Sequence, residues 1–328
     1  MPRSERSASP WTRNILAVLV AGAALGISHW NLDPFYTGEE GGGRHKANAS
    51  PPRLPPSPEM PYRLADGETS GKTSTPAPAT QLSDDPNTLR GVWAIKMARA
   101  LLERGCNQFS QVPDYTASMF RQERIGGALS EGQSIELKVR HEPFSVYMKW
   151  LSGDRGRQLI YVADQNNGNI LVQPGGIKGR LTGLLSLEPT GSMAMAESRH
   201  PVTQAGLLQL GHTVMKYQQG DLDRGTGFSC ELRDHQEFEG RPCYLYFITY
   251  DSPEIHDVYR KSLIYVDKEL LLPICVKNYT WAKDATPETL DDETLIEFYA
   301  YTDLKIQQQL NATAFDQNNS DYKLRVRR

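Results

Sequence analysis

The feature that most limits the fold of this chain is a two-residue period of apolar side chains. Apolar and polar residues alternate along three successive stretches, at residues 115–124, 134–140 and 144–151. Side chains on a β-strand point to opposite faces in turn, so this period predicts strands that bury one face. The third stretch brings four large apolar side chains onto a single face: Phe144, Val146, Met148 and Trp150.

The remaining strands are expected in one hairpin and one meander. Apolar residues 158–162 and 170–172 flank a polar Gln-Asn-Asn-Gly turn, in which Gly168 would supply a positive φ. The last third of the chain predicts five more strands, at residues 228–236, 243–250, 261–266, 272–281 and 295–306. The chain is therefore predicted to be mainly antiparallel β.

The turn expected at Glu239-Gly240 leads to a prediction about two cysteines. A two-residue turn there places Cys243 opposite Gln236 and leaves Cys230 farther along the hairpin. Bridged Cα atoms lie within about 7 Å of each other, whereas about six strand residues span roughly 20 Å. A disulfide between Cys230 and Cys243 is therefore disfavoured.

Helices are expected to cover the sheet. The strand at 244–248 is apolar on both faces, which an open sheet with one face in water would not tolerate. Asp85-Pro86 predicts the start of a helix that runs to Gly105, and a second helix is expected from near Thr203 to Gly220. The first helix would pack an apolar stripe against the sheet: Leu89, Val92, Trp93, Met97, Ala100 and Leu101.

Together these elements predict an α+β fold, a curved half-barrel sheet with two or more helices packed on its concave face. Such a sheet would leave an apolar trough between the helices and the strands. The trough is expected to be lined by one strand and closed by the second helix, with these ligand-binding residues: Phe144, Val146, Met148, Trp150, Leu207 and Leu210. The alternative that these side chains only fill a dry core stays open. The Gly-rich loop at 174–198, which carries Met193 and Met195, is expected to touch the functional site.

The N-terminal sequence is typical of a membrane-targeting segment. Three arginines precede residues 14–32, which carry no formal charge and centre on an apolar run at 15–27. Residues 1–30 are therefore expected to be a signal peptide, or an uncleaved anchor that holds the chain in the inner membrane through residues 15–32. In both cases the positive flank stays in the cytoplasm, so the rest of the chain is expected in the periplasm.

Between this segment and the first predicted helix lies a proline-rich stretch. Residues 31–84 contain nine prolines interleaved with Gly, Ser and Thr, and they lack a core-forming pattern. This composition predicts a disordered linker, which leaves residues 85–328 as one folded domain.

Charge and motifs exclude several classes of function. The chain has 36 Lys and Arg against 39 Asp and Glu, so no basic excess favours nucleic acid as a partner. Nucleophile-elbow, zinc-protease and dinucleotide-binding motifs are absent from the sequence, and no cofactor or metal ion is expected. His200 could act as an acid or base, but a single His beside a Pro at a helix start more often makes a structural hydrogen bond.

Several short segments of the chain resemble one bacterial family, catalogued as domain of unknown function 1571. The resemblance covers residues 91–324 and is carried mainly by these segments: Leu137-Lys138-Val139-Arg140, Pro143-Phe144, Val146-Tyr147-Met148-Lys149-Trp150, Gly156-Arg157, Tyr161 and Arg199-His200-Pro201-Val202-Thr203. The order of elements is also similar to that of the Lol-type (LolA-like) lipoprotein-carrier superfamily. That similarity implies a half-barrel with a helical lid that binds acyl chains, and it implies no catalytic residues.

Three functions remain as hypotheses. The first is a carrier or binding module that holds a lipid, or the acyl chain of a lipoprotein, in the trough. The second is a membrane-tethered envelope sensor or scaffold that interacts with another envelope protein, and the third is an uncharacterised enzyme. A retained N-terminal anchor favours the sensor, because a shuttle has to leave the membrane.

Overall fold

The computed structural model describes residues 85–282 and 285–325. The predicted targeting segment at 1–30 and the proline-rich stretch at 31–84 lie outside the described residues. Within the described ranges, no helix combines the length and the hydropathy needed to cross a bilayer.

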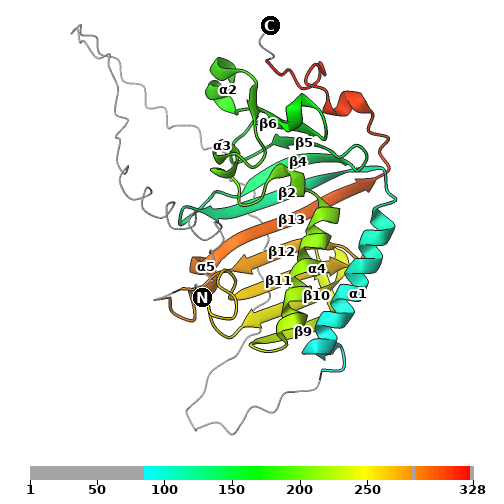
Figure 1. Ribbon diagram of the computed structural model, residues 1–328, viewed down its shortest axis with the longest axis vertical. Helices are drawn as coiled ribbons and strands as arrows, with labels where there is room; N and C mark the ends of the chain where they lie inside the picture. Colours follow the sequence, from blue (N-terminus) through cyan, green and yellow to red (C-terminus); the bar gives the residue numbers. More distant parts are fainter. Residues whose placement is uncertain (1–84, 283–284, 326–328) are drawn as a thin grey trace, which may run out of the picture. The chain divides into compact units, whose positions relative to one another are not determined.

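The core of the fold is one antiparallel sheet of 13 strands (Figure 1). Its strands are β1 (Thr88–Arg90), β2 (Asp114–Ile125), β3 (Ala128–Leu129), β4 (Gln133–Arg140), β5 (Ser145–Trp150), β6 (Gln158–Val162), β7 (Ile170–Gln173), β8 (Leu185–Leu187), β9 (Phe228–Phe238), β10 (Arg241–Tyr250), β11 (Lys261–Asp267), β12 (Pro273–Tyr279) and β13 (Leu295–Ile306). They are ordered β1-β9-β10-β11-β12-β13-β2-β4-β5-β6-β7-β8, with β3 beside β2. Among the described residues the two end strands do not pair with each other, so the curved sheet stays open.

Five helices accompany the sheet in the described part of the chain. They are α1 (Val92–Phe109), α2 (Gly176–Thr182), α3 (Ser192–Met195), α4 (Leu207–Arg224) and α5 (Leu290–Thr294). Figure 1 shows α1 and α4 side by side in front of β9 to β12. A buried cluster joins Ile95 and Leu102 of α1 to Leu232 of β9 and Ile248 of β10, so α1 packs on one face of this half of the sheet.

The first helix begins later than its sequence predicts, and it buries a different face. Residues 88–90 form β1 and pair with Arg233, Leu232 and Glu231 of β9, so they continue the sheet instead of opening a helix. The helix begins only after Gly91, whose φ of 62° ends the strand. The expected stripe is therefore wrong: Trp93 is 71% exposed, whereas the smaller Ala94 and Ala98 are buried. Small side chains allow the helix to lie close to the sheet.

Close packing also explains why α1 has a glycine at position 105, inside the helix, where the sequence predicts its end. A Cβ atom at this position would lie 2.1 Å from the carbonyl oxygen of Leu271, in the connection between β11 and β12. The backbone of α1 therefore lies against the backbone of this connection, and the helix ends at Phe109 instead of at the glycine.

The second long helix starts four residues after Thr203, which lies in a short 3-10 turn at Val202–Gln204. It runs through the expected end at Gly220 and stops at Gly225, whose φ of 77° is the left-handed cap typical of a helix C-terminus. Leu207 and Val214 of α4 are buried, as their helical spacing predicts.

The predicted hairpins are confirmed. Strands β6 and β7 pair across a turn in which Gly168 has a φ of 78°. Strands β9 and β10 turn at Glu239-Gly240, and Cys243 lies opposite Gln236. Cys230 pairs instead with Ile248, and the four cysteines are free and buried.

Candidate functional site

A cavity of about 160 Å³ lies between the sheet, α4 and the segment that leads into α4. The strands that line it extend from β10 through β13 and β2 to β7, so it faces the middle of the sheet. The remaining wall comes from α4 and from residues 187–205, which begin at the last residue of β8 and include α3.

One side of the cavity is apolar. Its wall combines aliphatic, thioether and indole side chains from four strands of this half of the sheet: Met119 of β2, Met148 and Trp150 of β5, Leu159 of β6 and Ile170 of β7. Thioether side chains adapt to irregular shapes at small energetic cost, so this wall suits a flexible apolar ligand.

The middle of the lining holds two buried carboxylates that the sheet register brings together. Glu123 of β2 lies directly opposite Glu297 of β13, and the two residues are 2% and 1% exposed. Like charges at opposed strand positions repel each other, and buried charges require partners. The residues that neutralise and hydrogen-bond these two carboxylates therefore show which segment packs over this part of the sheet.

Segment 198–201 supplies that compensation. Arg199 donates from Nε to Glu297 over 2.6 Å and from its backbone N–H to Glu123 over 3.3 Å. His200 Nε2 lies 3.2 Å from the Glu297 carboxylate, which matches the hydrogen-bonding interpretation of this histidine. Asn278 Nδ2 and the Tyr259 hydroxyl also donate to Glu297, over 2.7 and 3.1 Å. The carboxylates thus fasten the cavity wall to the sheet.

These contacts change the pKa values of both partners. Burial alone would raise the pKa of Glu297, but the hydrogen bonds from His200 and Arg199 outweigh it and lower that pKa to about 2. The hydrogen bond to Glu297 in turn raises the pKa of His200 above its ordinary value, against the opposing effect of burial. A charged pair is therefore favoured in mildly acidic solution.

A second set of contacts joins α3 to the sheet at the edge of the cavity. Arg157, just before β6, forms an ion pair with Glu197, which follows α3, and its guanidinium stacks on Trp150 with 4.9 Å between guanidinium carbon and ring centre. Arg121 of β2 lies 5.7 Å from the same ring and donates to Ser198 over 3.2 Å. We refer to the Arg157–Glu197 ion pair as the latch.

Besides Arg157 Nε, two buried polar groups on the cavity lining have no hydrogen-bond partner among the described residues. They are the side-chain amide of Gln218 in α4 and the hydroxyl of Tyr246 in β10, and both residues are 2% exposed or less. An unsatisfied buried polar group costs about 1–3 kcal/mol, so a ligand or water that bonded to it would recover stability. The nearby Asp221 already accepts from Tyr250 and Arg224.

The structure divides the six residues that the sequence singled out. Three of them line the cavity: Met148, Trp150 and Leu210. Val146 and Leu207 are fully buried in the adjacent core, away from the cavity lining, and Phe144 lines a smaller hollow of about 100 Å³ beside Leu208. Their contact with a ligand stays a prediction.

Sequence reasoning missed the polar side of the cavity. The alternation in β2 continues from Met119 to Arg121 and Glu123, so the strand period already places both charges on the face of the buried methionine. A charge at a core-facing strand position was the available signal. The pairing of Glu123 with Glu297 depends on strand order, which no local pattern contains.

The fold and site together define a class: an α+β protein with an open, curved antiparallel sheet and a part-apolar, part-charged cavity under a helical cover. The family follows from the chain itself. The model of the DUF1571 family, described as a protein of unknown function, matches residues 112–324, so this chain belongs to that family. A comparison with curated proteins found no match.

Solved structures of similar outline show low sequence identity to this chain. The lipoprotein LppX of Mycobacterium tuberculosis is 11% identical over 67% of this chain and 99% of its own, with a TM-score of 0.39. A putative outer membrane lipoprotein-sorting protein domain from Vibrio parahaemolyticus is 11% identical over 68% of this chain and 98% of its own, with a TM-score of 0.32. The matched chain in the MucA/MucB complex structure of Pseudomonas aeruginosa is 14% identical over 67% of this chain and 60% of its own, with a TM-score of 0.37.

Proposed function

We propose that this protein is a non-enzymatic binding module outside the cytoplasm that holds an acyl chain of a lipid or lipoprotein in its cavity. The observation that carries the proposal is the cavity itself, whose wall of Met119, Met148, Leu159 and Ile170 offers apolar contact area in the interior of the sheet. Apolar cavities with a few polar groups are the usual form of small-molecule sites.

The family resemblance supports the same location. Trp150, Arg157 and His200 belong to the segments that carry the resemblance, and all three line this cavity although His200 is more than forty residues from the other two. A polar end of the ligand would find charged groups beside Trp150 and unpaired groups at Gln218 and Tyr246.

The size of the cavity sets a condition on binding. A cavity of about 150 Å³ accommodates a group the size of benzene, so about 160 Å³ holds only part of a long acyl chain. The proposal therefore requires the cover to move outward as the chain enters. The cover consists of α4 and residues 187–205, and we propose that it lies on the concave face of the half-barrel and acts as its lid.

The setting of the module follows from the N-terminal sequence. We propose that residues 15–32 direct export and tether the domain to the inner membrane through the linker at 31–84. A tethered module would stay within reach of membrane lipids and of an envelope partner.

The test is binding of a naturally fluorescent long-chain fatty acid to the purified full chain. Met148→Ala should weaken binding several-fold, because Met148 contributes apolar contact area to the cavity. Val146→Ala is the matched control: it lies on the same strand and face, but in the dry core. This control should lower the free energy of unfolding and leave the affinity of the folded protein unchanged.

Stability separates the two readings of Met148. A fully packed methionine truncated to alanine costs about 2–5 kcal/mol, whereas a side chain that borders a cavity should cost markedly less. A large loss of stability in Met148→Ala, together with no fatty-acid binding by the wild type, would contradict the proposal and leave the cavity as an imperfection of the core.

A further inference from the structure

The segment between β7 and α4 exposes three large apolar side chains at one end of the sheet. Ile177 and Leu181 of α2 are 75% and 79% exposed, and Met193 of α3 is 65% exposed. Figure 1 shows α2 and α3, both green, at the end of the sheet that carries β5 and β6. We refer to Ile177, Leu181 and Met193 as the apolar tip. Exposed apolar patches on soluble domains commonly mark interaction sites.

The geometry of α2 explains why this face is turned outward. Ile177 and Leu181 are four residues apart and share one side of the helix, whereas the buried Gly179 lies on the other side. A Cβ atom on Gly179 would lie 1.8 Å from the carbonyl oxygen of Pro174, which directly follows β7. The inner side of the helix therefore packs so closely on this backbone that only a glycine fits there. The close approach of the backbone at Gly179 therefore keeps Ile177 and Leu181 on the outer side of α2.

The charge of the segment indicates what it would contact. Residues 174–193, which hold all three residues of the apolar tip, include Lys178 and Arg180 against one acidic residue, Glu188, although the whole chain has a formal net charge of −3. Basic residues that alternate in sequence with exposed aliphatic residues are typical of segments that lie in the headgroup region of anionic membranes.

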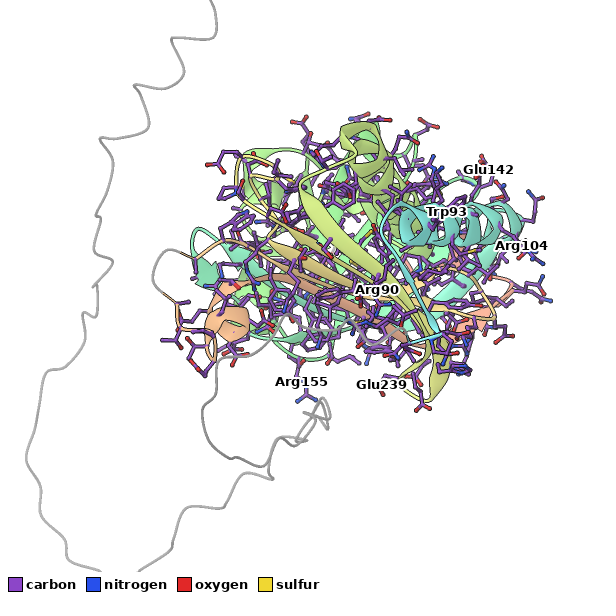
Figure 2. The ribbon with its side chains drawn as sticks, turned by 90° about the horizontal axis from the view of Figure 1, so that it is seen from below. Arg90, Trp93, Arg104, Glu142, Arg155 and Glu239 are labelled. Atoms are coloured by element: carbon purple, nitrogen blue, oxygen red, sulfur yellow. The ribbon has the colours of Figure 1, made fainter. Side chains whose placement is uncertain are left out.

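The same segment continues into the cavity wall. After α2 the chain forms β8 and α3, and Leu187, Ala194 and Met195 then line the cavity. Trp93 of α1 is similarly exposed at 71%, but α1 contributes no residue to the cavity lining. Figure 2 labels Trp93 on α1, where it can serve as a control position.

We propose that the apolar tip docks the protein on an anionic lipid bilayer, with Ile177, Leu181 and Met193 at the boundary between headgroups and acyl chains. Docking there would hold the latch and the cavity wall at the membrane surface, where an acyl chain could pass directly into the site. That second step rests on the proposed function, whereas docking itself does not.

The test uses a polarity-sensitive fluorophore on Leu181→Cys in the full chain. The four native cysteines are buried and burial raises their pKa values, so the added thiol should be labelled selectively. Phosphatidylglycerol vesicles should shift the emission to the blue, and phosphatidylcholine vesicles should shift it much less. The same label on Trp93→Cys should not respond. A local label reports docking at its own site, whatever residues 1–84 contribute to vesicle binding.

The double variant Lys178→Glu/Arg180→Glu tests the charge. Each basic residue near an anionic surface contributes about 1 kcal/mol to binding. This variant should therefore need at least about ten times more lipid to reach the half-maximal emission shift. It should still bind fatty acid in solution, and this outcome separates a failure of docking from a failure of the cavity proposal.

Two results would overturn the docking proposal. One is a vesicle response at Trp93→Cys without one at Leu181→Cys. The other is a blue shift at Leu181→Cys that appears without vesicles and grows with protein concentration, because the tip would then bind a second copy of the chain.

Discussion

Replacing Glu297 by glutamine tests whether the buried carboxylate fastens the cavity wall to the sheet. Glutamine keeps the shape of the side chain and removes its charge, so Arg199 and His200 lose their common anionic partner. Breaking a buried ion pair on one side is expected to cost about 3–5 kcal/mol. The variant Glu297→Gln should therefore be clearly less stable than the wild type at neutral pH.

The pKa of Glu297 gives an independent value for how much this carboxylate stabilises the fold. Its value falls from 4.5 to about 2 on folding, and each pKa unit corresponds to about 1.4 kcal/mol, so the ionised carboxylate stabilises the fold by about 3 kcal/mol. Because the pKa is lowered by folding, this contribution is present above pH 4.5 and is lost as the pH falls toward 2. At pH 3 less than half of it should remain.

Urea unfolding of the wild type and of Glu297→Gln at pH 7 and pH 3 measures both quantities. A difference of about 3 kcal/mol at pH 7 corresponds to a shift of about 6–12 °C in Tm for a domain of this size. The control is Glu239→Gln, an exposed turn residue visible in Figure 2, which should change stability by less than about 0.5 kcal/mol. A loss below 1 kcal/mol at pH 7, or a loss of equal size at pH 3, would refute the reasoning.

Three other perturbations have definite expected outcomes. Folding raises the pKa of His200, so protonated His200 stabilises the fold fully below pH 6.5, and this stabilisation is lost as the pH rises through the raised pKa. The variant His200→Gln should therefore show a smaller difference in the free energy of unfolding between about pH 6 and pH 9. Gly105→Ala should lower Tm by many degrees because its Cβ would meet the backbone of Leu271, whereas Gly220→Ala in the open part of α4 should stabilise by about 0.5–1 kcal/mol; similar Tm values for the two variants would contradict the close contact. Glu197→Gln removes the latch, and stopped-flow mixing should show faster fatty-acid entry; an unchanged rate would mean that the latch does not limit access.

Much of the sheet could be predicted from the sequence because its signals are local. Strand alternation in β4 and β5, the Gly168 turn and the Glu239-Gly240 turn each depend on a few neighbouring residues. The turn also sets the register that keeps Cys230 away from Cys243.

The error at α1 has a physical cause that the pattern does not contain. Large apolar residues such as Trp93 and Met97 have the helical spacing expected of a core face, yet the helix buries Ala94 and Ala98 because its backbone approaches the sheet at Gly105. The buried face also carries Ile95 and Leu102, so the distance between elements decides which of two apolar faces is buried.

The candidate site was predicted only on its apolar side. Met148, Trp150 and Leu210 were found from periodicity, and they line the cavity. The polar side requires long-range pairing of β2 with β13 and the return of residues 198–201 across both strands, and such contacts join segments about a hundred or more residues apart.

Lipid extraction and native mass spectrometry of the purified full chain test the central claim most directly. The account predicts that the wild type carries, or takes up at one site, a molecule with an acyl chain, and that Met148→Ala retains less of it than Val146→Ala. A wild-type protein that stays free of ligand after exposure to fatty acids and phospholipids, while both variants behave alike, would contradict the account.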